Sequence, residues 1–427
     1  MARVVIVGGG FAGCAAALAA TKAGAKVTLI EKTDLIIGAG IRAGRMNNDG
    51  KLTAAEEMKA LGGGAIFQAL ESIILHQAAL WSDEKHGYTY NVSKAEPLVK
   101  DMILEAGVDL RLQSRAVDVR KDKARVRAVK LADGEIIEGD VFIDTSGSSG
   151  GVSICTRYGR GCVMCIYYRC PTYGDRVSIA TKAGARELMR YRPDGTPGAV
   201  GAAVSIYKDT LSSELRDELE TVGKVTVPMP KQMVDYQKAA NMGAVHPTAR
   251  MESINLLDIG PSAKCTAISY FPLEWFRKIP GFERAHIEDP PGGGRFNRIR
   301  SVSMAPRDDA LLVEGFENLF CAGEKCGPIS GVAECIATGA LAGHNAVRAA
   351  VGAKPLVLPT TTVMGDYVAF AGEKMRTEPV LRTGYSLAAP TYFPRLVEKG
   401  LYTDDVAKIK ARIEGEGLSG VMAKKLV

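Results

Sequence analysis

The 427-residue sequence predicts an α/β fold, and three observations support this prediction. The first is a strand, a glycine-rich turn, a helix and a second strand within residues 4–31. The second is a run of alternating strands followed by an apolar strand at 140–144, and the third is a strand–helix return at 318–350. Together they predict a Rossmann-like domain with a β-meander, plus an inserted α+β substrate or cap domain.

The glycine-rich turn contains Gly8, Gly10 and Gly13 in the spacing G-x-G-x-x-G. In this motif the first glycine allows a tight turn, the second allows the backbone to approach a pyrophosphate, and the third allows the helix to pack on the strand. Glu31 ends the second strand, where a carboxylate can accept hydrogen bonds from both hydroxyls of an adenosine ribose. The pattern therefore predicts a dinucleotide site. A glycine-rich connection in another α/β unit is the alternative.

Composition is typical of a globular protein, with 46% hydrophobic and 24% charged residues. The net charge of +6 is too small to indicate a polyanionic partner. Nine cysteines with no recognisable targeting segment indicate a reducing, cytoplasmic environment, and no apolar run is long enough to predict a membrane span.

Residues 53–80 have helical spacing that Gly62–Gly64 interrupts, so we expect two helices. Ser93 and Glu96 predict a capping box for a helix that runs to Gly107. Strands are then expected at 108–112, 116–119 and 126–131, and Asp133-Gly134 predicts a hairpin turn after the last of them.

The strand at 140–144 runs into Thr145-Ser146-Gly147, which returns the chain to the dinucleotide sheet. Small residues at such a place let the backbone pass close to a cofactor. We expect Thr145 and Gly147 to contact the cofactor, together with Val117 in the meander.

The return at 318–350 predicts a second contact with the same nucleotide. A contact so far along the chain suits a long, extended cofactor, which indicates FAD. We expect Gly323 and Glu324 to lie at the ribityl chain and the helix beginning near Gly331 to face the flavin pyrimidine, where its dipole stabilises negative charge. Arg45, in the glycine-rich connection 38–50, is expected near the pyrophosphate and the isoalloxazine. The alternative to FAD is an NAD enzyme with an ordinary strand–helix return. The alternative for the connection 38–50 is a solvated surface loop.

These elements predict a discontinuous FAD-binding domain at 1–150 and 316–370. An inserted substrate or cap domain is expected at 172–315, where the sequence pattern changes to mixed strands and turns with many prolines. A helical segment is expected at 371–427. A cysteine-rich segment at 151–171 separates the first two parts.

The cysteine-rich segment reads CTRYGRGCVMCIYYRCP, with four cysteines in sixteen residues: Cys155, Cys162, Cys165 and Cys170. Thiolates at such spacing, followed by a proline, predict a [4Fe-4S] cluster beside the flavin. Structural zinc, a redox dithiol at Cys162 and Cys165, and unliganded thiols are the alternatives. Elsewhere Cys326, next to the ribityl contact, is a weak catalytic candidate. Its alternative role is a small residue packed against the ring.

Two families resemble this chain. The segment ENLFCAGEKCGPISGVAECIATGALAGHNAVRAAVGAKPLVLPTTTVMGDYVAF at 317–370 resembles the FAD-binding part of the folate- and FAD-dependent tRNA uracil-5-methyltransferases and of related wobble-uridine-modifying flavoproteins. The segments HGYTYNVSKAEPLVKDMILEAGVDLRLQSRAVDV and DVFIDTSG are similar to FAD-dependent oxidoreductases of the glutathione-reductase type. The methyltransferases carry a nucleophilic cysteine soon after the first strand–helix–strand unit, whereas residues 33–80 here contain none.

The resemblance and the motifs imply an FAD-dependent oxidoreductase that transfers electrons between a reductant and a small organic substrate, with coupling to an iron–sulfur cluster. The alternative is a tRNA- or rRNA-modifying flavoprotein that takes a one-carbon unit from a folate. We expect a small-molecule substrate, an electron-transfer partner protein, no membrane association and a homo-oligomer. RNA is the partner that the alternative implies.

Overall fold

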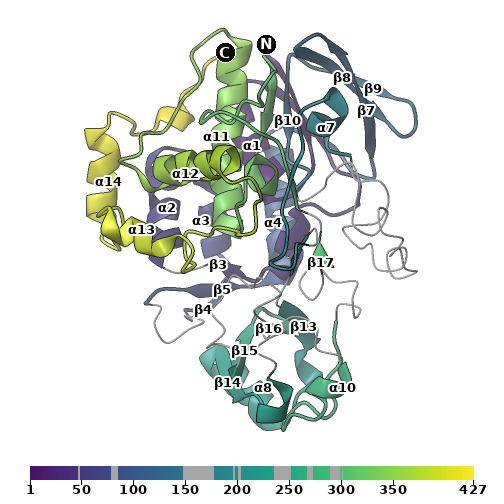
Figure 1. Ribbon diagram of the computed structural model, residues 1–427, viewed down its shortest axis with the longest axis vertical. Helices are drawn as coiled ribbons and strands as arrows, with labels where there is room; N and C mark the ends of the chain where they lie inside the picture. The colour runs from purple at the N-terminus through teal and green to yellow at the C-terminus, as the bar shows by residue number, and fades with distance from the viewer. Residues whose placement is uncertain are drawn as a thin grey trace.

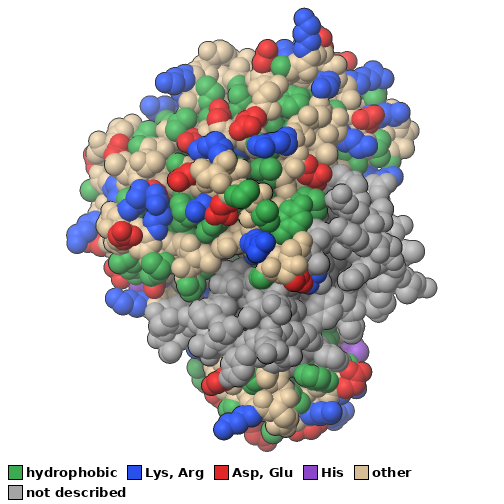
Figure 2. Space-filling view, in the orientation of Figure 1, with side chains coloured by type: hydrophobic (Ala, Val, Ile, Leu, Met, Phe, Trp, Pro, Cys, Tyr) green, Lys and Arg blue, Asp and Glu red, His purple; other side chains and the backbone are tan. Residues whose placement is uncertain are grey.

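The computed structural model describes residues 1–46, 49–77, 85–147, 177–195, 198–200, 203–234, 252–266, 273–288, 299–300 and 302–427. Most helices gather around one parallel sheet, and a smaller antiparallel sheet lies below them in Figure 1. Lys and Arg side chains are interspersed with Asp and Glu over the described surface in Figure 2, as the small net charge leads one to expect. Among the described residues, no helix has the length and apolar character needed to cross a membrane.

The parallel sheet has the order β19-β10-β1-β2-β6. Its central strands are apolar and buried because helices and loops cover both faces. The strands are β1 (Arg3–Val7), β2 (Lys26–Ile30), β6 (Asp109–Arg111), β10 (Val141–Asp144) and β19 (Leu319–Cys321). The strand from the end of the chain thus pairs directly with β10, which confirms the predicted α/β fold with a Rossmann-like sheet.

Two helices from opposite ends of the chain, α1 (Phe11–Lys22) and α11 (Val332–Ala350), lie side by side against this sheet (Figure 1). Glycines make the close approach possible. A Cβ on Gly339 would lie 2.2 Å from the carbonyl oxygen of Ala12, and one on Gly343 would lie 2.2 Å from that of Ala16. Any larger side chain would separate the helices.

The predicted β-meander follows as β7 (Ala116–Asp122), β8 (Arg125–Leu131) and β9 (Ile136–Glu138), with successive strands antiparallel. Before it, α4 spans Val92–Glu105, but the predicted capping box is wrong. Asn91 caps this helix by accepting a hydrogen bond from the Ser93 N–H. Glu96 instead accepts one from the Ile36 N–H at 3.3 Å. The helix therefore begins two residues earlier than a Ser93 cap implies.

The interrupted helical segment forms α2 (Asp49–Ala60) and α3 (Ala65–Glu71), as predicted. The second helix ends earlier than expected because the chain turns into β4 (Ile74–His76). This strand pairs with β5 (Tyr88–Tyr90), which pairs in turn with β3 (Arg45–Met46). Further along the chain, α7 (Ile179–Ala183) packs on the meander. Two pairs of short strands follow: β11 (Leu188–Met189) with β18 (Ser303–Met304), and β12 (Ala199–Val200) with β17 (Ile299–Arg300).

A separate sheet with the order β13-β16-β15-β14, together with α8 and α10, forms what we call the small lobe. It has its own apolar cluster, which includes Ile206, Leu256 and Phe276. Its elements are β13 (Ala203–Tyr207), α8 (Ser213–Val222), β14 (Lys224–Pro228), β15 (Ser253–Asp258), β16 (Ser262–Thr266) and α10 (Leu273–Phe276). The lobe meets the rest of the protein where the Val92 N–H donates to the Ile259 carbonyl at 3.1 Å and His76 pairs with Asp258 at 2.9 Å.

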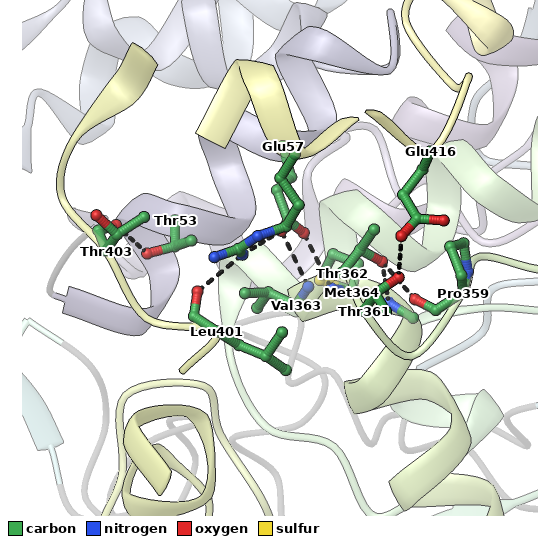
Figure 3. Close-up of polar contacts among 12 residues, drawn as sticks. Thr53, Glu57, Pro359, Thr361, Thr362, Val363, Met364, Leu401, Thr403 and Glu416 are labelled. Atoms are coloured by element: carbon green, nitrogen blue, oxygen red, sulfur yellow. Dashed lines mark hydrogen bonds and ion pairs between the residues drawn. The ribbon is translucent and has the colours of Figure 1, made fainter. Parts of the chain in front are cut away.

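The last part of the chain folds as α12 (Val363–Thr377), α13 (Phe393–Glu398) and α14 (Val406–Gly415). Figure 3 shows how Glu57 of α2 ties two of these helices to the main body. Its buried carboxylate accepts hydrogen bonds from the N–H groups of Val363 and Met364, at 3.0 and 3.2 Å, and pairs with Arg412 at 3.0 Å. The carboxylate therefore satisfies donors at the beginning of α12 that would otherwise be buried without acceptors.

Candidate cofactor site

The three motif glycines differ in what surrounds them. A Cβ on Gly8, which has φ +111°, would lie 2.5 Å from the Thr145 carbonyl oxygen, and one on Gly13 would lie 1.9 Å from the Gly8 carbonyl oxygen. At Gly10 a Cβ would have nothing within 4 Å. Gly8 and Gly13 are therefore required by the fold of the protein itself. Gly10 instead faces open space, which is where a pyrophosphate would approach the backbone.

The beginning of α1 lies at this open space. Gly10 precedes the helix, no side chain caps it, and its first turn contains no acidic residue. The first N–H groups of a helix and its positive dipole end form an anion-binding site. The geometry therefore suits a phosphate group next to Gly10.

Glu31 lies at the tip of β2 and is 9% exposed. Its Oε2 accepts a hydrogen bond from the Gly9 N–H at 2.7 Å, and its Oε1 accepts from the Thr33 N–H and hydroxyl at 3.0 and 3.1 Å. A carboxylate has about four acceptor positions, so three donors leave room for one more. The side chain thus orients the glycine turn and can still accept a bond from a ribose hydroxyl.

The segment after β10 closes the other side of the turn. The Thr145 hydroxyl donates to the carbonyl of Gly8 at 2.7 Å, and Gly147, with φ +69°, has open space where a Cβ would lie. Asp144 holds this segment in place. Its carboxylate accepts from the Ser146 hydroxyl and from the Ser178 hydroxyl, each at 2.6 Å. Val117, in β7, is only half-buried.

The return segment places Gly323, with φ +66°, against α1, where a Cβ would lie 2.9 Å from that of Ala12. Glu324 is buried next to it. The Cys326 thiol donates to the Gly323 carbonyl at 3.1 Å, and burial raises the pKa of this thiol although the Arg307 guanidinium opposes the shift. A buried, protonated thiol is a poor nucleophile. These contacts favour the role of a small packed residue for Cys326.

Gly331, the residue before α11, has φ +150° and no side chain caps the helix. The carboxylate of Glu334, in the first turn, folds over it: a Cβ on Gly331 would lie 1.9 Å from Glu334 Oε2. Lys51 of α2 lies 3.9 Å from the same oxygen. A buried ion pair therefore stands at the beginning of the helix that the sequence places at the flavin.

Basic residues gather next to this pair. Lys264, from β16 of the small lobe, is half-buried and donates a hydrogen bond to the Ala43 carbonyl. Burial lowers its pKa to about 7, with further contributions from the charges of Arg45 and Lys51. Arg45, the predicted cofactor contact, thus lies close enough to the small lobe to influence a lysine there.

The residues present fit an FAD molecule. The structure brings together, around one turn, the residues predicted for the nucleotide end: Gly8, Gly10, Gly13, Glu31, Thr145 and Gly147. Gly10 and Gly147 are both half-buried, and a Cβ at either would meet open space, which leaves room for a ligand at the uncapped beginning of α1. Gly323 and Glu324 lie in the 3-10 turn that follows β19, and Gly331 directly precedes α11.

Sequence reasoning missed four residues: Lys51, Asp144, Lys264 and Glu334. Glu334 could have been found, because it is an acid in the first turn of a predicted helix. Lys51 and Lys264 carry no local signal. Cys155, Cys162, Cys165 and Cys170 lie outside the described residues, and the described part of the chain contains no group of His, Cys, Asp and Glu that could hold a metal ion.

Comparison with known families gives two matches. Residues 3–152 match the family described as FAD dependent oxidoreductase, and residues 271–354 match the family described as glucose inhibited division protein A. A methylenetetrahydrofolate–tRNA-(uracil-5-)-methyltransferase from Caldicellulosiruptor bescii is 26% identical over 135 residues. That alignment covers 32% of this chain and 28% of the methyltransferase.

Two crystal forms of GidA from Aquifex aeolicus have a similar fold. Form II superimposes with a TM-score of 0.65 at 17% identity, covering 97% of this chain and 76% of GidA. Form I superimposes with a TM-score of 0.63 at 16% identity, covering 97% and 78%. At this identity the likeness shows the fold alone.

Proposed function

We propose that this FAD-dependent oxidoreductase oxidises or reduces a small organic substrate that binds near the small lobe. The chain also resembles the tRNA-modifying flavoproteins. The observation that carries the proposal is the open space at Gly10, at the uncapped beginning of α1, with Glu31 fixed next to it. The predicted domain limits, with an inserted domain at 172–315, stay part of this proposal.

Each part of the site has a task in binding and orientation. The Gly10 turn and the first N–H groups of α1 hold the pyrophosphate, and Glu31 selects an adenosine ribose that carries no 2′-phosphate. Glu324 and the beginning of α11 orient the flavin end of the cofactor. Lys264 connects the small lobe to this part of the site through its hydrogen bond to the Ala43 carbonyl. FAD, once bound, supplies two-electron transfer between a reductant and the substrate.

A visible absorption spectrum of the protein purified without oxygen tests the proposal, with FAD added to any material that is colourless. We expect the two resolved bands of a bound flavin and their loss when a reductant is added. Protein that stays colourless and does not take up FAD would contradict the proposal.

A second candidate function is modification of RNA. The match to the glucose inhibited division protein A family and the alignment with the tRNA methyltransferase support it. The chain aligns with only 28% of that methyltransferase, and residues 33–80 lack the cysteine that the family resemblance predicts. This function predicts RNA in the purified protein and an affinity for tRNA that falls steeply with salt concentration. Binding of tRNA that does not change with salt, or no binding, would set it aside.

We also propose that the cysteines at 155, 162, 165 and 170 bind a [4Fe-4S] cluster that exchanges electrons with the flavin and with a partner protein. Only their spacing in the sequence supports this proposal. Anaerobically purified protein is expected to contain iron and acid-labile sulfide, and to lose both when Cys162 and Cys165 are changed to serine. Zinc without sulfide would favour a structural site.

A further inference from the structure

The carboxylate of Glu334 is buried with one oxygen unsatisfied. The residue is 0% exposed, and its Oε1 accepts hydrogen bonds from the Ser386 hydroxyl at 2.7 Å and the Leu387 N–H at 2.9 Å. Oε2 has no hydrogen-bond partner among the described residues and lies over Gly331. A buried acceptor left without a donor costs about 1–3 kcal/mol. The arrangement therefore indicates a donor that the described residues do not provide.

Lys51 supplies the opposing charge. Its ammonium lies 3.9 Å from Glu334 Oε2, beyond hydrogen-bond distance, and its side chain is 17% exposed. Two charges thus lie at the positive end of the α11 dipole. The Lys51 ammonium adds to the positive potential there, and the Glu334 carboxylate opposes it. Because both are largely removed from water, their effect on a neighbouring ring is stronger than at the surface.

We propose that the Lys51–Glu334 pair faces the pyrimidine edge of the isoalloxazine and sets the reduction potential of the bound flavin through two opposing charges. The inference rests on the proposed FAD site. The free acceptor of Glu334 suits the imino N–H of that edge, and Lys51 suits its carbonyl groups. Both residues would act on the flavin ring by their charge, and neither exchanges electrons with the substrate.

The signs of the effect follow from electrostatics. Two-electron reduction with uptake of one proton adds a negative charge to the ring. A neighbouring cation stabilises this charge and raises the potential, whereas a neighbouring anion lowers it. Lys51→Met leaves the Glu334 carboxylate uncompensated, so the potential falls. Glu334→Gln leaves the Lys51 ammonium uncompensated, so the potential rises.

Equilibration of the FAD-loaded protein with a redox dye measures these shifts. We expect each single variant to change the ratio of reduced to oxidised flavin at a fixed dye ratio by about tenfold, in opposite directions, which is about 30 mV for a two-electron couple. The double variant Lys51→Met, Glu334→Gln removes both charges and should return to within about threefold of the unchanged protein. A purely structural role cannot move two variants in opposite directions and restore their combination.

Lys59→Met is the matched control. Lys59 lies on the same helix with a side-chain exposure of 16%, and it pairs with Glu56 and Glu71 instead of Glu334. Its potential should equal that of the unchanged protein. If the unchanged protein binds no FAD, the proposed function fails. If FAD binds and both single variants leave the potential unchanged or move it in the same direction, the present inference fails while the proposed function stands.

Discussion

The carboxylate of Glu31 accepts a hydrogen bond from the backbone N–H of Gly9 at 2.7 Å, and this bond joins the tip of β2 to the glycine turn. The predicted ribose contact is thus also part of the scaffold that shapes the pyrophosphate site. A substitution at Glu31 should therefore affect FAD binding in two ways, through the ribose contact and through the shape of the glycine turn.

Glu31→Gln should raise the dissociation constant of FAD by about tenfold, because a charge-assisted hydrogen bond becomes a neutral one. Quenching of flavin fluorescence during titration of the apoprotein measures the constant. Glu314→Gln, at an exposed glutamate, is the control and should bind FAD like the unchanged protein. Equal affinity of the Glu31 and Glu314 variants would remove Glu31 from the site.

Gly10→Ala and Gly13→Ala should separate a binding role from a folding role. At Gly10 a methyl group meets open space and φ is −69°, so the apoprotein should keep its melting temperature while FAD binding is lost. At Gly13 the methyl group would overlap the Gly8 carbonyl, so the apoprotein should lose about 1–3 kcal/mol of stability. Thermal unfolding with and without FAD distinguishes the two. FAD binding that survives Gly10→Ala would place the pyrophosphate elsewhere.

Lys264 should make stability depend on pH above neutrality. Its pKa in the folded protein is about 7, below the ordinary lysine value of 10.5, so between these values the unfolded state holds a proton that the folded state lacks. Stability should therefore rise as pH rises from about 7 to about 10, by at most about 1.4 kcal/mol per pH unit for one proton. Below pH 7 both states hold the proton and the contribution no longer changes.

Denaturant unfolding across this pH range provides the measurement. Lys264→Met should flatten the dependence, whereas Lys278→Met, at an exposed lysine, should not. If the Lys264 variant keeps the slope of the unchanged protein, another group titrates in this window.

Glu57→Ala should destabilise the protein by about 3 kcal/mol, because it leaves two buried N–H groups of α12 without an acceptor and removes the carboxylate that pairs with Arg412, whose guanidinium keeps the Leu401 carbonyl. Glu56→Ala removes the neighbouring carboxylate, which pairs with Lys59 nearer the surface, and should cost about 1 kcal/mol or less. Chemical denaturation of the two variants measures the difference. Equal losses would show that the contacts in Figure 3 contribute little.

Local patterns predicted much of the architecture. The glycine turn, α1, the meander and the β19–α11 return lie where their patterns placed them, because each depends on neighbouring residues: glycine at positive φ, alternation in strands, and small residues where helices touch. The error at α4 has the same local origin. Ser93 and Asn91 can both cap a helix, and only the path of the preceding chain decides between them.

By itself, then, the sequence determined the α/β sheet, the dinucleotide motif and the acid at Glu31. Tertiary structure alone decided that Gly10 is open while Gly13 is closed, and that Lys51 meets Glu334 and Glu57 meets Arg412. Lysine, arginine and glutamate are normally exposed, so the sequence does not predict that these residues are buried in pairs. Such pairs form only when helices distant in the chain pack together, and it is the packing that turns an ordinary surface charge into part of a site.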